Sequence, residues 1–306
     1  MQCAVGIDVG GTKCAAGLVS LDDGSVVARC LQPTRPERGG KAVLAEVIEL
    51  ARSLQADAKR LGIQPKSVGI GLCELVGFDG QILSDATIRW MGISVLAKIE
   101  QETRLPLFLD ADVRAAARAE AHFGAGRNLR CFLYVTVGTG ISSCLVLNKT
   151  PFAGARGLTG TFASGNGLIA GSNGQLLSGP PLEQFASGPA LAARFAATSV
   201  GFTGAAPDVL ALAERGDPLA RPIVETAGQA LGAAIAHLVN VLDPEAIVIG
   251  GGLGLAAGLY RRSMEESLRQ YVWSELHQDV PLLSASLGND AGIIGAALAA
   301  DARDAN

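Results

Sequence analysis

The sequence lacks the features by which several large classes of protein are recognised. It contains no uninterrupted apolar run of the roughly 20 residues that a bilayer requires, so we expect no membrane span. Lysine and arginine (25) do not outnumber aspartate and glutamate (29) and form no basic block, so we expect no nucleic-acid binding. The first residues carry no basic segment, and Asp8 interrupts the first apolar stretch, so we expect no secretory leader and a cytoplasmic protein.

Two further absences concern metal sites and nucleotide-binding loops. The six cysteines show no C-x-x-C spacing, so neither a zinc site nor a redox pair is indicated, and small buried apolar side chains are their simplest role. The G-x-x-x-x-G-K-[ST] spacing of the P-loop is missing as well. Any phosphate-binding segment of this chain is therefore of another type.

The chain does contain enough apolar residues for a large core spread over two domains. Hydrophobic residues make up 49% of the 306 and aromatic residues only 5%, so Ala, Leu, Val and Ile are expected to fill that core. Apolar residues at strand-like and helix-like spacing alternate along the first part of the chain. We predict strands at 3–9, 14–19, 25–31, 67–72 and 106–110, and helices at 41–61, 94–103 and 113–123.

The start of the chain has a counterpart farther along. Segments 7–19 and 135–147 share the order apolar strand, glycine turn, apolar strand, which suggests two duplicated domains. Residues 149–180 are rich in Gly, Ser and Pro and predict a long loop region. For the remainder we predict strands at 131–137, 143–148, 246–250 and 281–285, and helices at 182–198, 207–214, 218–241, 255–270 and 292–301.

The first glycine turn carries an unusual set of polar neighbours, Asp8-Val9-Gly10-Gly11-Thr12-Lys13. A turn without side chains leaves its backbone N–H groups open to phosphate oxygens. Thr12 adds a hydroxyl group and Lys13 a cation, while a carboxylate at a strand end is suited to holding Mg²⁺ through water. We predict that a nucleotide's phosphates and Mg²⁺ bind here, and the alternative is an ordinary hairpin turn. The predicted residues are Asp8, Gly10, Gly11, Thr12 and Lys13.

Two later glycine segments fit the same ligand. The turn Gly138-Thr139-Gly140 again presents bare backbone and a hydroxyl group, and would hold the phosphates from the opposite side. The run 250–252 follows a buried strand and would allow a flat group such as adenine with its ribose to approach closely. The alternatives are a plain turn and a glycine-rich strand-to-helix connection. The predicted ATP contacts are Gly138, Thr139, Gly140, Gly251 and Gly252.

Two acids, Asp110 and Asp112, stand where a strand meets a helix. Transfer of a phosphoryl group to an alcohol needs a carboxylate that orients the hydroxyl and accepts its proton. Asp is also a favoured helix cap, so one of the two acids is free to cap while the other acts as the base. We predict Asp112 as the catalytic base.

With these features in this order, the chain resembles the ROK family of sugar kinases, a branch of the actin/hexokinase superfamily. DVGGTK (8–13) and VTVGTG (135–140) are similar to the family's phosphate segments, IVIGGG (247–252) to its adenosine segment and NDAGIIGAA (289–297) to its closing segment. The stretch 109–126 is similar to the one that holds the family's catalytic Asp, which falls on Asp112. LEQFASGPAL (182–191) is similar to a segment whose Glu, here Glu183, contacts the sugar.

The resemblance implies an α/β protein with the two-lobed actin-like ATPase (ribonuclease H-like) fold, in which duplicated domains surround a central cleft. We expect a small domain at 1–112, joined by a C-terminal helix at 292–306, and a large domain at 113–291. ATP and Mg²⁺ are the implied cofactors, and a homodimer is the implied assembly. The family also contains repressors with an N-terminal DNA-binding domain, but here the first phosphate strand starts near Met1, so we do not expect a transcription factor.

Departures from the family pattern concentrate around the acceptor. The Asn that usually precedes the catalytic Asp is Ala111, and a loop that usually reads Pro-Gly reads Cys73-Glu74. The family's G-E-x-x-H segment reads Gly160-Thr161-Phe162-Ala163-Ser164, and residues 165–181 contain no Cys or His, so we expect no zinc. Arg114 stands where the family often has Asn, and its expected partner is an acid or a phosphate. Trp90 is expected to pack in the core rather than stack on the substrate.

These departures make glucose, N-acetylglucosamine and N-acetylmannosamine doubtful acceptors, because a site that loses hydrogen-bonding groups discriminates strongly. We predict an ATP-dependent kinase that phosphorylates a hydroxyl, most simply a primary one, of an unusual sugar, aminosugar or C7-cyclitol of the valiolone type. The alternatives are an ordinary hexose kinase, a catalytically weak sugar or nucleotide sensor, and a kinase that uses polyphosphate. The predicted small-molecule contacts are Glu74, Asp110, Asp112, Thr161, Ser164 and Glu183.

Overall fold

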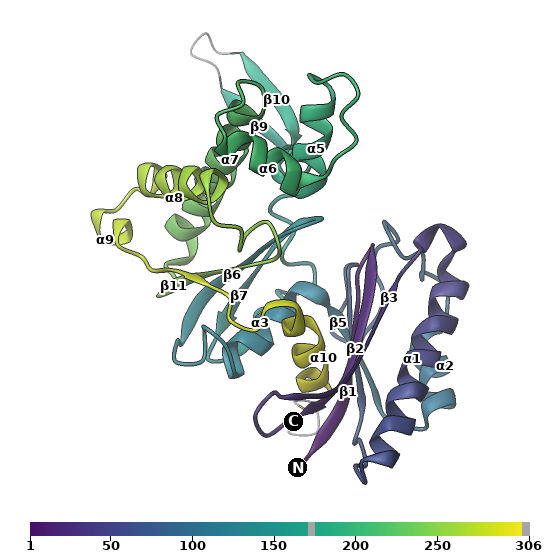
Figure 1. Ribbon diagram of the computed structural model, residues 1–306. Helices are drawn as coiled ribbons and strands as arrows, with labels where there is room; N and C mark the ends of the chain where they lie inside the picture. The colour runs from purple at the N-terminus through teal and green to yellow at the C-terminus, as the bar shows by residue number, and fades with distance from the viewer. Residues whose placement is uncertain (171–174, 302–306) are drawn as a thin grey trace. The chain divides into compact units, whose positions relative to one another are not determined.

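The computed structural model describes residues 1–170 and 175–301. These residues form two compact units, each of which is described by itself (Figure 1). No helix in the described ranges is long and apolar enough to span a bilayer. The first unit comprises 1–129, 146–159 and 286–306, and the second comprises 130–145 and 160–285.

The first unit is built on a five-stranded sheet in the order β3-β2-β1-β4-β5. β1 pairs antiparallel with β2, while β4 runs parallel to both β1 and β5. The central strands β1 and β4 are covered on both faces, which explains why they read as continuous apolar runs. The strands are β1 (Cys3–Val9), β2 (Lys13–Ser20), β3 (Val26–Pro33), β4 (Val68–Leu72) and β5 (Leu107–Ala111).

Helices cover both faces of this sheet (Figure 1). Because side chains alternate along a strand, Val5 and Ile7 of β1 join a core with one pair of helices, while Ala4 joins a second core with another pair. The first pair is α1 (Gly40–Arg60) and α2 (Val95–Thr103), and the second is α3 (Asp112–His122) and α10 (Ala291–Asp301). Short elements complete the unit: η1 (Pro36–Arg38), β8 (Thr150–Pro151) and η2 (Gly288–Asp290).

α10 lies unusually close to the sheet and to α3, because three glycines remove the side chains between them. A Cβ atom on Gly69 would lie 1.8 Å from the carbonyl oxygen of Ala296, and one on Gly6 would lie 2.0 Å from that of Ile293. On the opposite side, a Cβ on Gly295 would lie 1.6 Å from the carbonyl oxygen of Ala115. Backbone therefore packs directly on backbone along this helix.

The second unit carries most of another five-stranded sheet, in the order β12-β11-β6-β7-β8. β11 runs parallel to β6 and β12, and the division between the units falls inside β7. A separate antiparallel pair forms from β9 (Asn166–Ala170) and β10 (Leu176–Pro181). The strands of the larger sheet not yet given are β6 (Cys131–Val137), β7 (Ile141–Leu147), β11 (Ala246–Gly250) and β12 (Leu282–Ser284).

The helices of the second unit pack around a large apolar core that includes Tyr260 and Met264. α7 and α8 approach closely, because a Cβ on Gly232 would lie 2.1 Å from the carbonyl oxygen of Met264. The helices are α4 (Leu182–Ala186), α5 (Gly188–Ala196), α6 (Ala206–Glu214), α7 (Ala220–Leu242), α8 (Leu259–Tyr271) and α9 (Glu275–Gln278).

The predicted α/β fold class is confirmed, but three local predictions are wrong. The segment 149–180 is not all loop, because it contains β8, β9 and β10. The helix predicted at 182–198 is two helices, since Ser187 ends α4 and its hydroxyl caps α5 by accepting from Ala190 N. The helix predicted from 255 begins at Leu259, after Gly258 adopts a φ of 121°. Residues 302–306 of the predicted C-terminal helix lie outside the described residues.

The domain division at residue 112 stays a prediction, and the compact units have other bounds. The first unit continues to residue 129 because α3 packs against α10. Residues 286–301 return to the same unit, as the placement of α10 on β1 and β4 requires.

Replacing Gly295 by alanine tests the close packing of α10. Alanine is a better helix former than glycine by about 0.5–1 kcal/mol, so the substitution would stabilise a helix position that has no close neighbour. We expect instead that the free energy of unfolding falls by about 1–3 kcal/mol, because the added carbon would overlap Ala115. The measurement is urea unfolding followed by circular dichroism.

Gly179→Ala is the matched control for this substitution. A Cβ atom there meets no atom within 4 Å, and the residue lies in an exposed part of β10. We expect its unfolding midpoint to match that of the unchanged protein. A Gly295→Ala variant that is as stable as this control would contradict the backbone-on-backbone packing.

Candidate active site

Carboxylates gather at the carboxyl ends of the parallel strands in the first unit. Strand register aligns Asp8 of β1 with Gly71 of β4, and Gly71 with Asp110 of β5. Asp112 follows β5 as the first residue of α3. A Cβ atom on Gly71 would lie 3.4 Å from Asp112 Cα and 3.9 Å from Asp8 Oδ1. The backbone of β4 at Gly71 therefore lies close to both aspartates.

Asp8 is a partly buried carboxylate without a protein donor among the described residues. Burial raises its pKa to about 6, and the charge of Lys13 opposes that rise. The first turn of α10 lies against it, since a Cβ on Gly292 would be 2.5 Å from Asp8 Oδ2. A carboxylate that is free of protein donors suits Mg²⁺, which keeps most of its waters when it binds. Asp8 thus fits the predicted water-mediated Mg²⁺ contact.

Asp112 has the properties of a general base. Burial and, to a lesser extent, the nearby charge of Asp8 raise its pKa to about 7. One oxygen accepts from Val113 N at 2.6 Å, and within the described ranges no donor contacts the other. Ala111, not an acid, occupies the N-cap position of α3, so the hypothesis that one of the two aspartates caps this helix is wrong. A carboxyl that titrates near neutral pH is well matched to accepting a proton from an alcohol.

The turn between β1 and β2 is held by hydrogen bonds within the protein, while two of its backbone N–H groups point to no acceptor among the described residues. Gly10 N donates to Lys13 O at 3.0 Å, and Thr34 Oγ1 donates to Gly10 O at 2.6 Å. Lys13 Nζ contacts Asn289 Oδ1 at 3.4 Å. In the part of the chain that the structure describes, the backbone N–H groups of Gly11 and Thr12 donate to no protein acceptor. They are thus available to an anionic ligand.

The second glycine turn lies in the other unit, beside Glu183. Ile141 N donates to Glu183 Oε2 at 2.8 Å, and a Cβ on Gly140 would lie 2.7 Å from the same oxygen. Gly188 N donates to Gly138 O at 2.9 Å, which ties the turn to the start of α5. Thr139 at the tip is exposed. The predicted sugar contact Glu183 therefore also supports the predicted phosphate turn.

The glycine run after β11 reaches this second turn. A Cβ on Gly251, whose φ is 80°, would lie 2.4 Å from Val137 O, and one on Gly250 would lie 2.4 Å from the hydroxyl of Tyr134. Gly252 faces open space, and its N lies 3.9 Å from where a Cβ on Gly138 would be. Packing explains two of the three glycines, and the predicted adenosine contact stays a prediction.

Glu74 is buried and its carboxylate is fully engaged within the protein, so it is not a solvated loop acid. Burial would raise its pKa, but hydrogen bonds from Ser84 and from three backbone N–H groups lower it. Oε2 accepts from Ser84 Oγ and Ala86 N, and Oε1 from the N–H groups of Thr87 and Ile88. The methyl group of Thr87 in turn packs near Gly11. Glu74 therefore fixes a loop beside the first phosphate turn.

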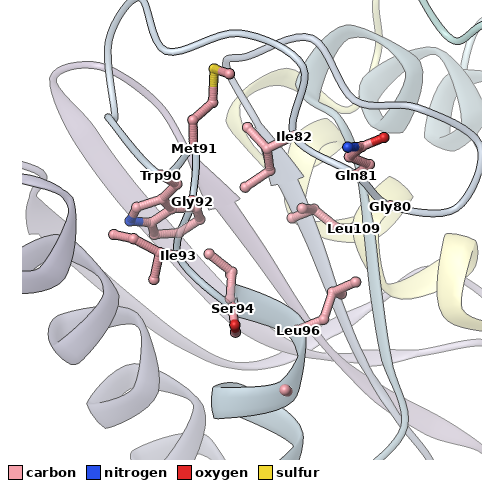
Figure 2. Close-up of a pocket in the computed structure, with 12 residues that line it drawn as sticks. Gly80, Gln81, Ile82, Trp90, Met91, Gly92, Ile93, Ser94, Leu96 and Leu109 are labelled. Atoms are coloured by element: carbon pink, nitrogen blue, oxygen red, sulfur yellow. The ribbon is translucent and has the colours of Figure 1, made fainter.

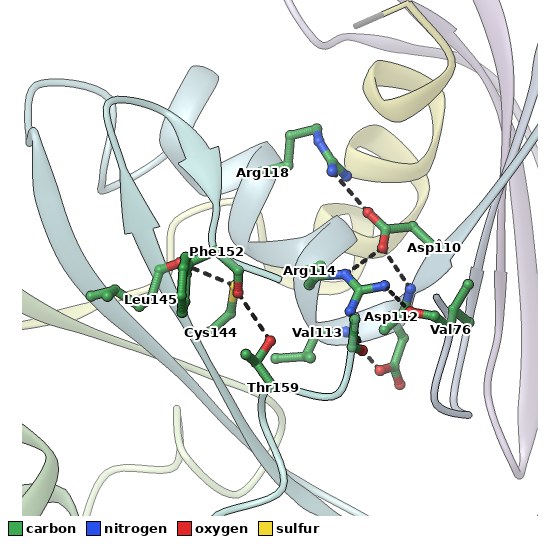
Figure 3. Close-up of polar contacts among 12 residues, drawn as sticks. Val76, Asp110, Asp112, Val113, Arg114, Arg118, Cys144, Leu145, Phe152 and Thr159 are labelled. Atoms are coloured by element: carbon green, nitrogen blue, oxygen red, sulfur yellow. Dashed lines mark hydrogen bonds and ion pairs between the residues drawn. The ribbon is translucent and has the colours of Figure 1, made fainter. Parts of the chain in front are cut away.

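Asp110 is also engaged, by two arginines of α3 (Figure 3). Its Oδ1 accepts from Arg114 Nε at 2.5 Å, and its Oδ2 from Arg118 Nη2 at 2.8 Å. Burial raises the pKa of this carboxyl, but the charges of Arg118 and Arg114 outweigh burial and hold it below the usual value. The prediction that Arg114 pairs with an acid is confirmed.

The segment that replaces the family's Glu and His is a short turn in the second unit. Ser164 N donates to Thr161 O at 3.0 Å, and Glu183 N donates to Ala163 O at 3.0 Å. The side chains of Thr161 and Ser164 are exposed. The structure thus brings Thr161, Ser164 and Glu183 into one neighbourhood, and their substrate contacts stay predictions.

Trp90 packs as predicted. It is fully buried, and its Nε1 donates to Gly40 O at 2.7 Å. Figure 2 shows it at the wall of a cavity of about 320 Å³, with Ile82, Leu96 and Leu109. Its lining is mostly apolar, with Gln81 and Ser94 as the polar side chains, and it contains none of the residues predicted to bind the acceptor.

Glu120 is a structural acid that the sequence reading missed. It is fully buried in α3 and accepts from the N–H groups of Ala125, Ser286 and Leu287. It thereby holds the segment that leads into α10. An acid on the alanine-rich, buried face of a predicted helix was the available signal.

Each unit assembles part of the predicted site. The first holds Asp8, the turn 10–13, Glu74, Asp110 and Asp112, and the second holds the turn 138–140, Gly251, Gly252, Thr161, Ser164 and Glu183. Their convergence on one ligand stays a prediction. Across residues 1–170 and 175–301, no three His, Cys, Asp or Glu side chains are grouped to hold a metal ion.

Comparisons with known proteins agree on one family. A family model described as "ROK family" matches residues 4–303. A glucokinase of Halalkalibacterium halodurans is 29% identical over 95% of this chain and 92% of its own. An N-acetylmannosamine kinase of Escherichia coli is 31% identical over 96% of this chain and 97% of its own. The crystal structure of a ROK hexokinase from Thermus thermophilus is 31% identical, with a TM-score of 0.81 over 99% of both chains.

Asp112→Asn should change stability in a pH-dependent way. The folded-state pKa of about 7 lies above the ordinary 3.8, so the folded protein favours the protonated form. This stabilising contribution is complete below about pH 4 and is lost as the pH rises through 7. Asparagine cannot ionise, so the Tm of the variant minus that of the unchanged protein should be larger at pH 8 than at pH 5. Differential scanning calorimetry measures the Tm of the variant and of the unchanged protein at each pH.

Asp110→Asn is the control for this titration. Its carboxyl is held in the charged form by two arginines, so the substitution should lower the Tm at pH 5 and at pH 8 alike. If the Asp112→Asn difference is equal at the two pH values, the raised pKa of Asp112 is wrong.

Proposed function

The chain belongs to the ROK family, and from this premise we propose that it is a kinase that transfers the γ-phosphate of ATP to a hydroxyl of a sugar-like polyol. The observation that carries the proposal is the state of Asp112. It is a carboxyl at a strand end with one backbone donor and a pKa of about 7, beside a second carboxylate and a bare glycine turn. The named sugar kinases among its relatives support the same reaction class.

In this reaction the chain's own groups orient the reactants and move one proton. The oxygen of the acceptor hydroxyl attacks the γ-phosphorus as ADP leaves, and Asp112 accepts the proton of that hydroxyl. The N–H groups of Gly11 and Thr12 and the ammonium of Lys13 hold phosphate oxygens, and the second turn at 138–140 does the same from its own unit. Asp8 would hold Mg²⁺ through water, and that ion supplies neutralisation of phosphate charge.

We propose an acceptor other than glucose: an unusual sugar, an aminosugar or a C7-cyclitol of the valiolone type. Thr161 and Ser164 are short, exposed hydroxyl side chains where the resemblance expects Glu and His. Ala111 likewise removes an amide next to Asp112. Lost hydrogen-bonding groups weigh against a substrate whose hydroxyls those groups would bind. An ordinary hexose kinase is the second candidate, because two relatives carry the names of hexose and N-acetylhexosamine kinases.

The proposal also includes a cytoplasmic location and a homodimer. The dimer is supported by the family resemblance alone. A catalytically weak sensor is the competing class of function. The kinase is favoured because Asp8 and Asp112 have few hydrogen-bond partners, which lowers stability, and a sensor does not need such carboxylates.

Asp112→Asn should remove turnover while leaving nucleotide binding. The protein is incubated with ATP and Mg²⁺ and a panel of hexoses, aminosugars and cyclitols including valiolone, and ADP is followed. Loss of the general base should lower kcat by about 10²–10⁴-fold on the active acceptor. A parallel series with polyphosphate in place of ATP identifies the donor.

The same assay separates the two classes of function. ATP binding in calorimetry, without ADP formation on any panel member, would support the sensor and exclude the kinase. Turnover with glucose as the best acceptor would keep the kinase and overturn the proposed substrate class.

Thr161→Glu should improve the use of glucose. A carboxylate in this exposed position restores one charge-assisted hydrogen bond of about 1.5–3 kcal/mol, which corresponds to at least a tenfold rise in kcat/KM for D-glucose. Thr203→Glu, at another exposed threonine of the second unit, is the control and should have no effect. Equal kcat/KM values for the two variants would show that residue 161 does not face the acceptor.

A further inference from the structure

Arg114 contacts three separate segments of the first unit through a buried guanidinium. It is 4% exposed and lies two residues after Asp112 on α3. Nε donates to Asp110 Oδ1 at 2.5 Å, Nη1 to Gly157 O at 2.8 Å and Nη2 to Val76 O at 2.6 Å (Figure 3). The planar guanidinium suits this task because its donors have fixed directions.

Two of these partners belong to loops that meet at this point. Val76 lies in the loop 73–84 after β4, and Gly157 in the loop 152–159 after β8. A Cβ on Gly157, whose φ is 80°, would lie 2.4 Å from Val76 O, so the two backbones touch. The same loops line a cavity of about 610 Å³ with Leu75, Gly77, Phe78, Asp79, Gln81, Leu83, Arg156 and Leu158. Arg114 therefore holds two walls of one cavity at a fixed separation.

Each contact of Arg114 lies beside a residue predicted to bind the acceptor. Asp110 is itself one of them, Val76 follows Glu74 by two residues, and Gly157 precedes Thr161 by four. The helix that carries Arg114 begins at Asp112. One side chain thus connects the helix that begins at Asp112 to loops adjoining residues predicted to bind the acceptor, of which Glu74 and Asp110 have their carboxylates engaged within the protein.

We propose that Arg114 is a positioning residue of the acceptor site, which acts by holding the loops 73–84 and 152–159 against the helix of Asp112. It does not touch the substrate, and the inference rests on the proposed kinase function. Loss of the guanidinium leaves the carbonyls of Val76 and Gly157 without this donor, while Asp110 Oδ1 keeps the N–H of Ala111, so the loops gain freedom and the acceptor is bound in more than one orientation.

Arg118 provides a matched control on the same helix. It donates to the same carboxylate, Asp110, but contacts neither loop, and its buried Nη1 has no partner among the described residues. Removing Arg118 thus perturbs the ion pair and the helix while leaving both loop carbonyls bonded to Arg114. A difference between the two arginines isolates the effect of the loop contacts.

Hydrogen–deuterium exchange of the free protein tests the loop contacts without any substrate. Arg114→Ala and Arg114→Lys should each speed amide exchange in residues 75–83 and 153–159 together, by tenfold or more for alanine and less for lysine. Arg118→Ala should leave both loops unchanged. Unchanged exchange in both loops of Arg114→Ala would overturn the proposal, and Arg114→Lys serves if the alanine variant fails to fold.

Steady-state kinetics with a panel acceptor that the protein phosphorylates tests whether Arg114 affects acceptor binding. In both Arg114 variants the acceptor KM should rise at least tenfold and kcat should fall, while the KM for ATP stays within twofold. Millimolar guanidinium chloride should partly restore the acceptor KM of Arg114→Ala and have no effect on Arg118→Ala. A lower Tm and a smaller active fraction with an unchanged acceptor KM would indicate a merely structural residue and overturn the proposal.

These results separate failure of the inference from failure of the proposed function. If the unchanged protein phosphorylates no acceptor, the kinase function fails and the assignment of Arg114 to an acceptor site falls with it. If the unchanged protein turns over normally and the Arg114 variants keep its acceptor KM, only the role of Arg114 is overturned.

Discussion

The site depends on two partly buried carboxyl groups, those of Asp8 and Asp112, which lie near each other and have few hydrogen-bond partners. Removing a charged carboxylate from water costs several kcal/mol unless hydrogen bonds or cations replace the lost hydration. Asp8 has no protein donor in the described part of the chain, and Asp112 has only Val113 N. Their raised pKa values express this deficit. Such an arrangement persists because the sheet and α10 hold it, and it gives the molecule one carboxyl suited to a hydrated cation and another suited to a proton.

Three neighbouring acids differ from Asp8 and Asp112 because their carboxylates have several partners within the protein. Glu74 and Glu120 are buried and Asp110 is partly buried, but each carboxylate accepts from backbone N–H groups or arginines. They hold a loop, a strand end and the entry to α10 in place around the two underbonded groups. Five acids of one unit thus divide into three that stabilise local structure and two that remain available. Sequence position alone does not separate these roles, because all five follow or join apolar segments.

Local patterns predicted most of the elements and the two aspartates of the strand ends, since apolar periodicity and glycine turns are properties of short segments. Contacts between residues far apart in the sequence could not be predicted from such local patterns. Nothing near Arg114 in the sequence indicates Val76 or Gly157 as partners, and the close packing of Gly69 on α10 joins residues from opposite ends of the chain. Glu74 was predicted as a substrate contact because its loop departs from the family, but its oxygens serve residues 84–88. The pairing of β9 with β10 was missed because Gly and Pro mask the strand pattern there.

That missed pairing shows how the second unit orders the segment that leads to Glu183. Residues 166–170 bond to 176–181, and the chain then enters α4, where Glu183 stands. The N–H of Glu183 donates to Ala163 O, and its carboxylate accepts from Ile141 at the end of the phosphate turn. Gly140 is required because that carboxylate occupies the space of a side chain. An acceptor hydroxyl that bonds to Glu183 must therefore share it with the turn that is expected to hold ATP. Under the proposed function, acceptor binding and phosphate binding in this unit would act on one carboxylate, so a shift of either ligand would change the hydrogen bonds available to the other.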